Sequence, residues 1–319
     1  MLKKDKYDEI FSFLEDKKNI LIAGHRNPDG DSVSAIIATR IYLLSKGIDS
    51  VMVTFDDIPR EYASLPLAGD FTRGDNISGV FDAAVLFECD SFERSGLMQY
   101  SRLPSINIDH HVSGKEFADI NIIDPAASSV CEMLFYAFYY RGFSFSDELA
   151  RVLFTGMASD TGFFRFSNTT ADTFYALMTL TGYNIEINRV YSELYENYSL
   201  KRLRLIGHIL YTSRYYEEVK TLCAILNREY IETYDIKKTD LEGIINYMLI
   251  SSELDIAVLI KEFVKDECFV SLRSKETADV GSIAGHFNGG GHRQASGFFM
   301  KKPPELAERL LIKEIRKRK

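Results

Sequence analysis

Short apolar runs alternate with segments of helical spacing through the first part of the chain. The runs lie at residues 20–23, 50–54, 83–87 and 106–108, and segment 31–46 has the periodicity of a helix that stops at Gly47. Strands that alternate with helices are typical of a parallel sheet. The sequence therefore predicts an α/β fold whose N-terminal domain is built on a parallel sheet.

The rest of the chain divides into a helical part and a smaller α/β part. Helical patterns dominate from Ser129 to about Tyr216. Beyond them, strands at 221–226, 256–260 and 268–272 intermingle with helices over 240–249 and 280–287. We therefore expect an N-terminal domain of residues 1–190, a helical linker of residues 191–219 and a smaller α/β domain of residues 220–319.

Acidic and imidazole side chains gather where the predicted elements of the first domain end. The clusters are His25-Arg-Asn-Pro-Asp-Gly-Asp31, Glu88-Cys-Asp90, Asp109-His-His111 and Ser159-Asp-Thr-Gly162. Open α/β folds bind ligands beyond the carboxyl ends of their strands, so chemistry is expected at this edge of the sheet. Carboxylate oxygens suit Mg²⁺ and Mn²⁺, and imidazole beside them moves the preference toward Mn²⁺ or another transition ion.

Each cluster also has a simpler explanation. A single Asp after a strand is more often a helix cap or a turn residue than a metal ligand. The chain has six histidines, however, and His25, His110 and His111 all fall at these strand ends. Ligand types on successive loops favour a metal site over coincidence. Two ions about 3.5 to 4 Å apart share a carboxylate and stabilise the attacking and leaving oxygens of a phosphoryl displacement.

The motifs of the chain resemble those of the DHH phosphoesterase superfamily. The matching positions are His25, Asp29, Asp31, Asp90, Asp109, His110, His111 and Asp160, and Gly289-Gly290-Gly291-His292 is similar to the signature of the DHH-associated domain. The two matches cover nearly the whole chain. In length the chain is most similar to NrnA-type nanoRNases, which degrade very short oligoribonucleotides and often dephosphorylate 3′-phosphoadenosine 5′-phosphate (pAp).

The resemblance implies two bound divalent ions, with Mn²⁺ preferred and Mg²⁺ as the alternative. The expected ligands are His25, Asp29 and Asp90 for one ion, and Asp31, Asp90, His110 and Asp160 for the other. Asp90 would be shared by both ions. The choice of His110 over His111 rests on the resemblance, because spacing does not distinguish the two.

Catalytic roles are expected for two further residues of the Asp-His-His motif. Asp109 would orient a histidine, and His111 would contact the phosphate or the leaving group. The resemblance places the active site in a cleft between the two domains. The reaction that it implies is metal-dependent hydrolysis of a phosphoric ester.

Substrate contacts are expected mainly in the second domain. A glycine triplet alone is most often a flexible turn, but glycines also let backbone amides approach an anion closely. In the family context Gly289, Gly290, Gly291 and His292 are expected to contact a phosphate or a nucleotide. Arg273-Ser274 is similar to an Arg-Ser element of related enzymes, and a forked guanidinium suits phosphate. Ser128 or Ser129 is expected to cap the following helix, and a contact of Ser128 with substrate stays open beside this capping role.

The charge of the chain limits the substrates that it can bind. The formal net charge is −8 at pH 7. Proteins that grip long nucleic acids present basic surfaces, because counterion release supplies much of their affinity. We therefore expect short oligoribonucleotides or pAp as partners and no long duplex DNA.

Location and assembly are less constrained by the sequence. No apolar stretch approaches the roughly 18 to 20 residues that a membrane span needs. The N-terminal residues are partly basic but lack the apolar core of a secretory signal. No membrane partner and a cytoplasmic location are expected. The oligomeric state stays open, and a homodimer is compatible with the sequence.

Three functions remain open at this point. The first is a nanoRNase that also removes the 3′-phosphate of pAp, and the second is a standalone phosphodiesterase of cyclic or linear dinucleotides. The third is a catalytically silent nucleotide-binding protein. The intact set of carboxylates argues against the third, because their mutual repulsion destabilises a protein that has no cation to bind.

Overall fold

The computed structural model describes residues 4–241 and 243–318, which form two compact units. The division falls between Asn197 and Tyr198, inside the predicted linker 191–219. Helix α7 (Ile187–Tyr195) precedes this point, and helix α8 (Leu200–Thr212) follows it. Apolar residues of α8 belong to a core of the second unit.

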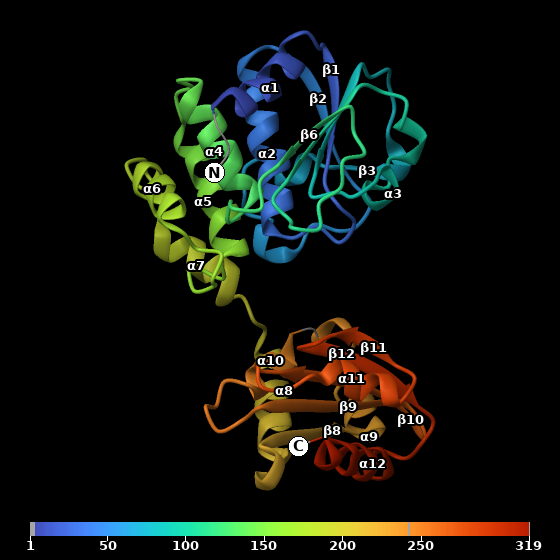
Figure 1. Ribbon diagram of the computed structural model, residues 1–319. Coiled ribbons are helices and arrows are strands. Elements are labelled where there is room, and N and C mark those ends of the chain that lie inside the picture. The colour runs from blue at the N-terminus through green and yellow to red at the C-terminus, as the bar shows by residue number, and fades with distance from the viewer. Residues whose placement is uncertain (1–3, 242, 319) are drawn as a thin grey trace. The chain divides into compact units, whose positions relative to one another are not determined.

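The first unit contains a six-stranded parallel sheet, as the sequence predicts (Figure 1). Its strands are β1 (Asn19–Ala23), β2 (Asp49–Thr54), β3 (Thr72–Arg73), β4 (Ala83–Phe87), β5 (Ser105–Asp109) and β6 (Ile120–Ile123). The order across the sheet is β3-β2-β1-β4-β5-β6. The direction of strand succession therefore reverses between β1 and β4. Ligands bind at such a reversal in doubly wound sheets, beyond the carboxyl ends of the strands.

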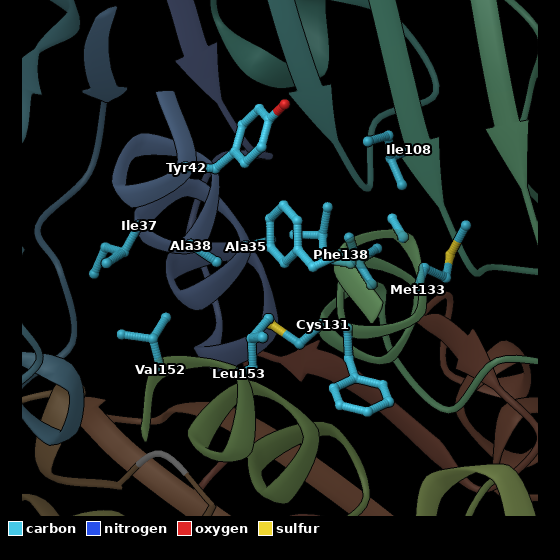
Figure 2. Packing of buried hydrophobic residues seen from close by; sticks show 14 of the residues in the cluster. Ala35, Ile37, Ala38, Tyr42, Ile108, Cys131, Met133, Phe138, Val152 and Leu153 are labelled. Carbon is cyan, nitrogen blue, oxygen red and sulfur yellow. The ribbon is translucent and has the colours of Figure 1, made fainter. Parts of the chain in front are cut away.

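Helices cover this sheet and form the main core of the first unit. They are α1 (Lys4–Glu15), α2 (Gly30–Ser45), α3 (Phe92–Ser95), α4 (Val130–Tyr140), α5 (Asp147–Asp160) and α6 (Ala171–Leu180), together with α7. Alternate residues of β1 point to opposite faces: Ile20 and Ile22 join the main core, and Leu21 and Ala23 join a smaller one. Figure 2 shows the close packing of α2, α4 and α5 in the main core.

A glycine allows the three central helices to approach one another. A Cβ atom at Gly156 of α5 would lie 2.3 Å from Sγ of Cys131 in α4 and 2.9 Å from Cβ of Ser34 in α2. Any side chain there would push α5 away from both neighbours. This close approach holds the C-terminal end of α5, which carries Asp160, beside the N-terminal end of α2, which carries Asp31.

The second unit contains a mixed six-stranded sheet of order β11-β12-β10-β9-β8-β7. Its strands are β7 (Arg214–Tyr216), β8 (Thr221–Leu226), β9 (Ile256–Val264), β10 (Glu267–Ser274), β11 (Gly290–His292) and β12 (Ala295–Met300). Strands β8 and β9 are parallel, and the other neighbouring pairs are antiparallel. The sequence predicts β8, β9 and β10 but not the edge strands β7 and β11 or the internal strand β12.

Helices pack on both faces of this second sheet. They are α8, α9 (Arg228–Thr233), α10 (Ile244–Met248), α11 (Val280–His286) and α12 (Pro304–Lys317). One face of the sheet contributes to a core with α11 and α12, and the other to a core with α8, α9 and α10. Across residues 4–241 and 243–318, none of the helices is both long and apolar enough to cross a membrane.

Candidate metal centre

Two histidines at the edge of the parallel sheet lie on either side of one glutamate. His25 follows β1, Glu88 follows β4 and His110 follows β5, so the three come from neighbouring strands. Nε2 of His25 lies 3.8 Å from Oε2 of Glu88, and Nε2 of His110 lies 3.4 Å from Oε1 of Glu88. Each oxygen of the Glu88 carboxylate therefore faces a different imidazole.

Glu88 belongs to two groups of candidate metal ligands. His25, Asp29 and Glu88 form one group, and Glu88, His110 and His111 form the other, with donor atoms within 4.8 Å of one another. Atoms that share one ion each lie about 2.0–2.2 Å from it, which places them about 3 to 3.5 Å apart. The separations around Glu88 are close to this range. The two groups could therefore hold two ions with Glu88 between them.

The surroundings of Glu88 provide an independent test of whether a cation fits. Both of its carboxylate oxygens are buried, as is Nε2 of His110, and none of the three atoms has a hydrogen-bond partner among the described residues. Burial raises the pKa of Glu88 well above its usual value, and the charges of Asp31 and Asp29 add to this. A buried carboxylate without donors is costly unless a cation compensates it. The residues present therefore fit a divalent ion.

Two aspartates, Asp160 and Asp31, add carboxylate groups near His110. Oδ2 of Asp160 lies 3.5 Å from Nε2 of His110. Burial raises the pKa of Asp160 to about 7, and the charge of Asp31 contributes to the rise. Burial also raises the pKa of Asp31, although His110 opposes the rise. Carboxylates gathered so closely repel one another until a cation or a proton enters the site.

Asp31 is fixed by the backbone at the start of a distant helix. Its carboxylate oxygens accept hydrogen bonds from the amides of Val130, at 2.5 Å, and Cys131, at 2.9 Å. These amides open the first turn of α4, where unpaired N–H groups attract negative charge. The orientation of Asp31 therefore depends on α4 as well as on its own helix.

Asp29 both caps a helix and faces the candidate metal centre. Its Oδ1 accepts a hydrogen bond from the Ser32 amide at 3.0 Å and caps α2, while its Oδ2 lies 3.7 Å from Nε2 of His25. The pKa of Asp29 is lowered, because the contacts with His25 and Ser32 outweigh the loss of part of its hydration. One oxygen thus positions the helix and the other faces the candidate metal centre.

Asp109 holds His111 through two contacts to the same oxygen. Oδ1 of Asp109 accepts a hydrogen bond from the backbone amide of His111 at 2.9 Å and lies 2.8 Å from Nδ1 of its ring. Burial raises the pKa of Asp109, but the hydrogen bonds from His111 outweigh this and lower it overall. Asp109 is buried, whereas the His111 ring is half exposed. This contact leaves Nε2 of His111 directed away from Asp109.

Asp90 lies outside both groups of donors, in contrast to the shared position expected for it. Its carboxylate contacts Oγ of Ser91 at 3.3 Å and Nζ of Lys115 at 3.5 Å, and its side chain is 42% exposed. Glu88 occupies the shared position because the chain turns directly after β4, where Glu88 has a φ of 55°. Sequence reasoning missed Glu88, although it directly follows a buried strand.

Ser128 is buried and its hydroxyl is already engaged. Its Oγ donates to Oε2 of Glu132 at 2.5 Å, and the capping of α4 falls to Ser129, whose Oγ accepts from the Glu132 amide. Asn168, which the sequence did not single out, bridges this region to the site. Its Nδ2 donates to the Ser128 carbonyl at 3.0 Å and lies 3.4 Å from Oδ2 of Asp160. Ser128 therefore helps to support the site through the backbone.

The glycine-rich element of the second unit forms the edge strand β11. A Cβ atom at Gly289 would lie 2.3 Å from the Gly297 carbonyl oxygen, and one at Gly291, where φ is 140°, would lie 2.4 Å from that of Ala295. Glycine is thus required for pairing with β12. Gly290 has open space where a Cβ would be, and residues 290–292 are exposed.

Arg273 and His292 lie on one face of the second sheet. Both pair with Ala295, Arg273 from β10 and His292 from β11, and directly paired residues of antiparallel strands share a face. Ser274, by contrast, is buried, and its Oγ donates to the Ala278 carbonyl at 2.8 Å. The pair available to a ligand is therefore Arg273 and His292.

Comparisons with known proteins agree with this architecture. Residues 19–157 match the model of the DHH family N-terminal domain, and residues 221–318 match that of the DHHA1 domain. The bifunctional oligoribonuclease and PAP phosphatase NrnA of Thermus thermophilus is 27% identical over 289 residues, which are 88% of this chain and 84% of that protein. The Bacillus subtilis protein of the same name is 27% identical over 68% of this chain and 70% of its own.

A solved structure extends the likeness to the whole chain. An exopolyphosphatase-related protein from Bacteroides fragilis matches with a TM-score of 0.86 and 25% identity, covering 99% of this chain and 96% of that one. The two domain models follow each other in the order that the motifs predict. The chain therefore belongs to the DHH family, with an N-terminal DHH domain followed by a DHHA1 domain, and is a phosphoesterase of the NrnA-like group.

Proposed function

We propose that this enzyme hydrolyses phosphoric esters of short oligoribonucleotides and removes the 3′-phosphate of pAp, with two divalent ions as cofactors. The observation that carries the proposal is the Glu88 carboxylate between His25 and His110, with both oxygens buried and without hydrogen-bond partners among the described residues. Two ions bridged by one carboxylate are a common arrangement for in-line displacement at phosphorus. Mn²⁺ suits a set that mixes imidazole and carboxylate donors.

The residues divide into two ligand groups with Glu88 in common. His25, Asp29 and Glu88 would hold one ion, and Glu88, His110, Asp31 and Asp160 would hold the other. Bound divalent ions would polarise the phosphoryl oxygens and lower the pKa of water. His110 is favoured over His111 as a ligand because its Nε2 is buried and has no hydrogen-bond partner among the described residues.

His111 and Asp109 would act on the substrate rather than on the ions. The Asp109 carboxylate fixes the His111 ring through Nδ1, so that Nε2 is available to the phosphate or the leaving oxygen. A protonated imidazole at this position could donate a proton to the leaving alkoxide.

The substrate class follows from charge and from the relatives. Both NrnA relatives carry the name of an oligoribonuclease and PAP phosphatase. A chain with a net charge of −8 is poorly suited to long polyanions but can bind a few phosphates through local cations. Arg273 and His292, which share a sheet face, are the proposed contacts of the second unit with the substrate.

A substrate panel tests this proposal. The protein is incubated with Mn²⁺ and pAp, linear dinucleotides and trinucleotides, cyclic dinucleotides or an RNA of about 24 nucleotides. We expect rapid turnover of pAp and the short linear RNAs, slow turnover of the long RNA, and loss of all activity in excess EDTA. Undiminished turnover after dialysis against EDTA would overturn the two-metal mechanism. A strong preference for cyclic dinucleotides would identify the alternative phosphodiesterase.

A further inference from the structure

Aromatic and cationic side chains continue the Arg273 face of the second sheet along β10. Phe269 lies four residues before Arg273 on the same strand, so the two point to the same side and lie about 13 Å apart. Phe269 pairs with Phe299 of β12 and with Lys261 of β9, which therefore share this face. We call Phe269, Phe299, Lys261 and the neighbouring Lys238 the Phe269 strip.

The two phenylalanines of the strip are unusually accessible for paired strand residues. Phe269 is 43% exposed and Phe299 is 41% exposed, and their ring centroids lie 5.0 Å apart. Exposed aromatic rings on a sheet are costly in water, but they stack well on planar ligands. Nucleobases stack on such rings without regard to sequence.

Two lysines of the strip lie beside the Phe269 ring. Nζ of Lys238 lies 5.5 Å from the centroid of Phe269 and 5.8 Å from that of Phe263. Nζ of Lys261 donates to Oγ of Ser271 at 2.7 Å. Within residues 4–241 and 243–318, no ion pair with a carboxylate is seen for either lysine or for Arg273.

These cations repel one another in the absence of an anion. Burial lowers the pKa of Lys261, and the charges of Arg273 and Lys238 lower it further. The side chains Lys238, Leu241, Lys261, Phe263 and Phe269 line a hollow of about 160 Å³. Two lysines line this hollow and the charge of Arg273 acts on one of them, so the hollow favours an anion such as a phosphate group.

We propose that the Phe269 strip is a subsite for a further nucleotide of a short RNA, in which Phe269 and Phe299 stack a base and Lys238 and Lys261 hold its phosphate. The inference rests on the proposed function, because it assumes that Arg273 and His292 anchor the first nucleotide. A single nucleotide such as pAp at Arg273 would leave Phe269 free. A trinucleotide would extend along β10 and occupy the strip.

Comparing two substrates in matched variants tests the subsite. Phe269→Ala should raise the KM for a trinucleotide by about tenfold and leave its kcat unchanged, because stacking contributes to ground-state and transition-state binding alike. The kinetic constants for pAp should stay at wild-type values. Tyr211→Ala is the control, since Tyr211 is a highly exposed aromatic residue on α8 of the same unit.

A direct binding measurement separates this subsite from the catalytic proposal. Anisotropy of a fluorescent trinucleotide in EDTA should show about tenfold weaker binding to Phe269→Ala. Lys238 lies in a loop outside the cores, so Lys238→Gln should leave the fold intact. The slope of the logarithm of the binding constant against the logarithm of the salt concentration should become shallower by about one in this variant, as for the loss of one phosphate contact. If wild-type protein binds the trinucleotide in EDTA but does not cleave it after Mn²⁺ is added in excess, the proposed function fails and the subsite proposal is retained.

Two outcomes would overturn the subsite itself. One is a trinucleotide KM in Phe269→Ala that equals that of Tyr211→Ala. The other is an equal rise in KM for pAp and for the trinucleotide, which would show that Phe269 supports the fold of the unit or the first nucleotide. Either result would leave the proposed hydrolysis of short RNA intact.

Discussion

Oε1 of Glu88 and Nε2 of His110 lie 3.4 Å apart, and neither atom has a hydrogen-bond partner among the described residues although both are buried. His25 approaches the second oxygen of the same carboxylate at 3.8 Å. Removing the charge of Glu88 should therefore affect both groups of ligands at once. No other single carboxylate belongs to both groups formed by the described residues.

Glu88→Gln should bind far less Mn²⁺ and lose at least about 100-fold in kcat, because the amide keeps the shape but not the shared negative charge. Metal content by mass spectrometry and turnover of pAp measure the two effects. Asp90→Asn is the matched control, since Asp90 contacts Ser91 and Lys115 instead. If Asp90→Asn loses metal and Glu88→Gln keeps it, Asp90 is the bridging residue.

Metal-free protein should become less stable as the pH rises from about 4 to 7, owing to Asp160. Its pKa is raised from 3.8 to about 7 in the folded state. In this pH range the folded state binds more protons at Asp160 than the unfolded state does, so the free energy of unfolding falls with rising pH. Asp160→Asn lacks this contribution and should be more stable than wild type by roughly 2 to 4 kcal/mol above pH 7.

Denaturant unfolding in EDTA across this pH range measures the difference between Asp160→Asn and wild type. The difference should grow from about pH 4 and level off above about pH 7. Added Mn²⁺ should stabilise wild type more than the variant, because the cation replaces the proton. A difference that does not change with pH would show that Asp160 does not titrate in this range.

Asp109→Asn should lower kcat by about 100-fold without loss of bound metal, because the carboxylate acts through the His111 ring. If so, the double variant Asp109→Asn/His111→Gln should be no slower than His111→Gln alone. Steady-state kinetics on pAp and metal analysis provide the data. Losses that multiply in the double variant would indicate that Asp109 has an independent role.

Arg273→Ala and His292→Ala should each slow hydrolysis of pAp and dinucleotides by about tenfold, the effect of losing a charge-assisted contact of roughly 1.5 kcal/mol. Both variants should hydrolyse bis-p-nitrophenyl phosphate at nearly the wild-type rate, since this small ester lacks a second phosphate to anchor. Glu88→Gln should lose both activities together. Equal losses on both substrates in His292→Ala would show that His292 does not recognise the nucleotide.

Much of the fold could be predicted from local sequence patterns. The predicted strand 83–87 coincides with β4, and the predicted helix 31–46 differs from α2 by one residue at each end. Five strands, β3, β6, β7, β11 and β12, were not predicted; three of them, β3, β7 and β11, have only two or three residues each, and β11 contains two glycines. Such short segments become strands through pairing with a neighbour, which local composition does not reveal.

The candidate site was predictable in position but not in every side chain. Clusters at strand ends identify the edge of the sheet, because parallel strands bring their carboxyl ends together. The direction of a side chain just beyond a strand depends on the next turn. The positive φ of Glu88 directs the glutamate to the histidines, and nothing in the pattern Glu-Cys-Asp signals such a turn. The hydrogen bond from Ser128 to Glu132 could not be predicted from the sequence either, because a serine before a helix usually caps that helix.

The anchoring of Asp31 by the first amides of α4 joins positions that are 99 and 100 residues apart. Closing a loop of this length costs conformational entropy, so we expect these partners to meet after the more local contacts have formed. A newly made chain would therefore have little affinity for Mn²⁺ until α4 is in position. Metal uptake during refolding would then report completion of the whole first unit, and the cation would act as a check that this unit has folded.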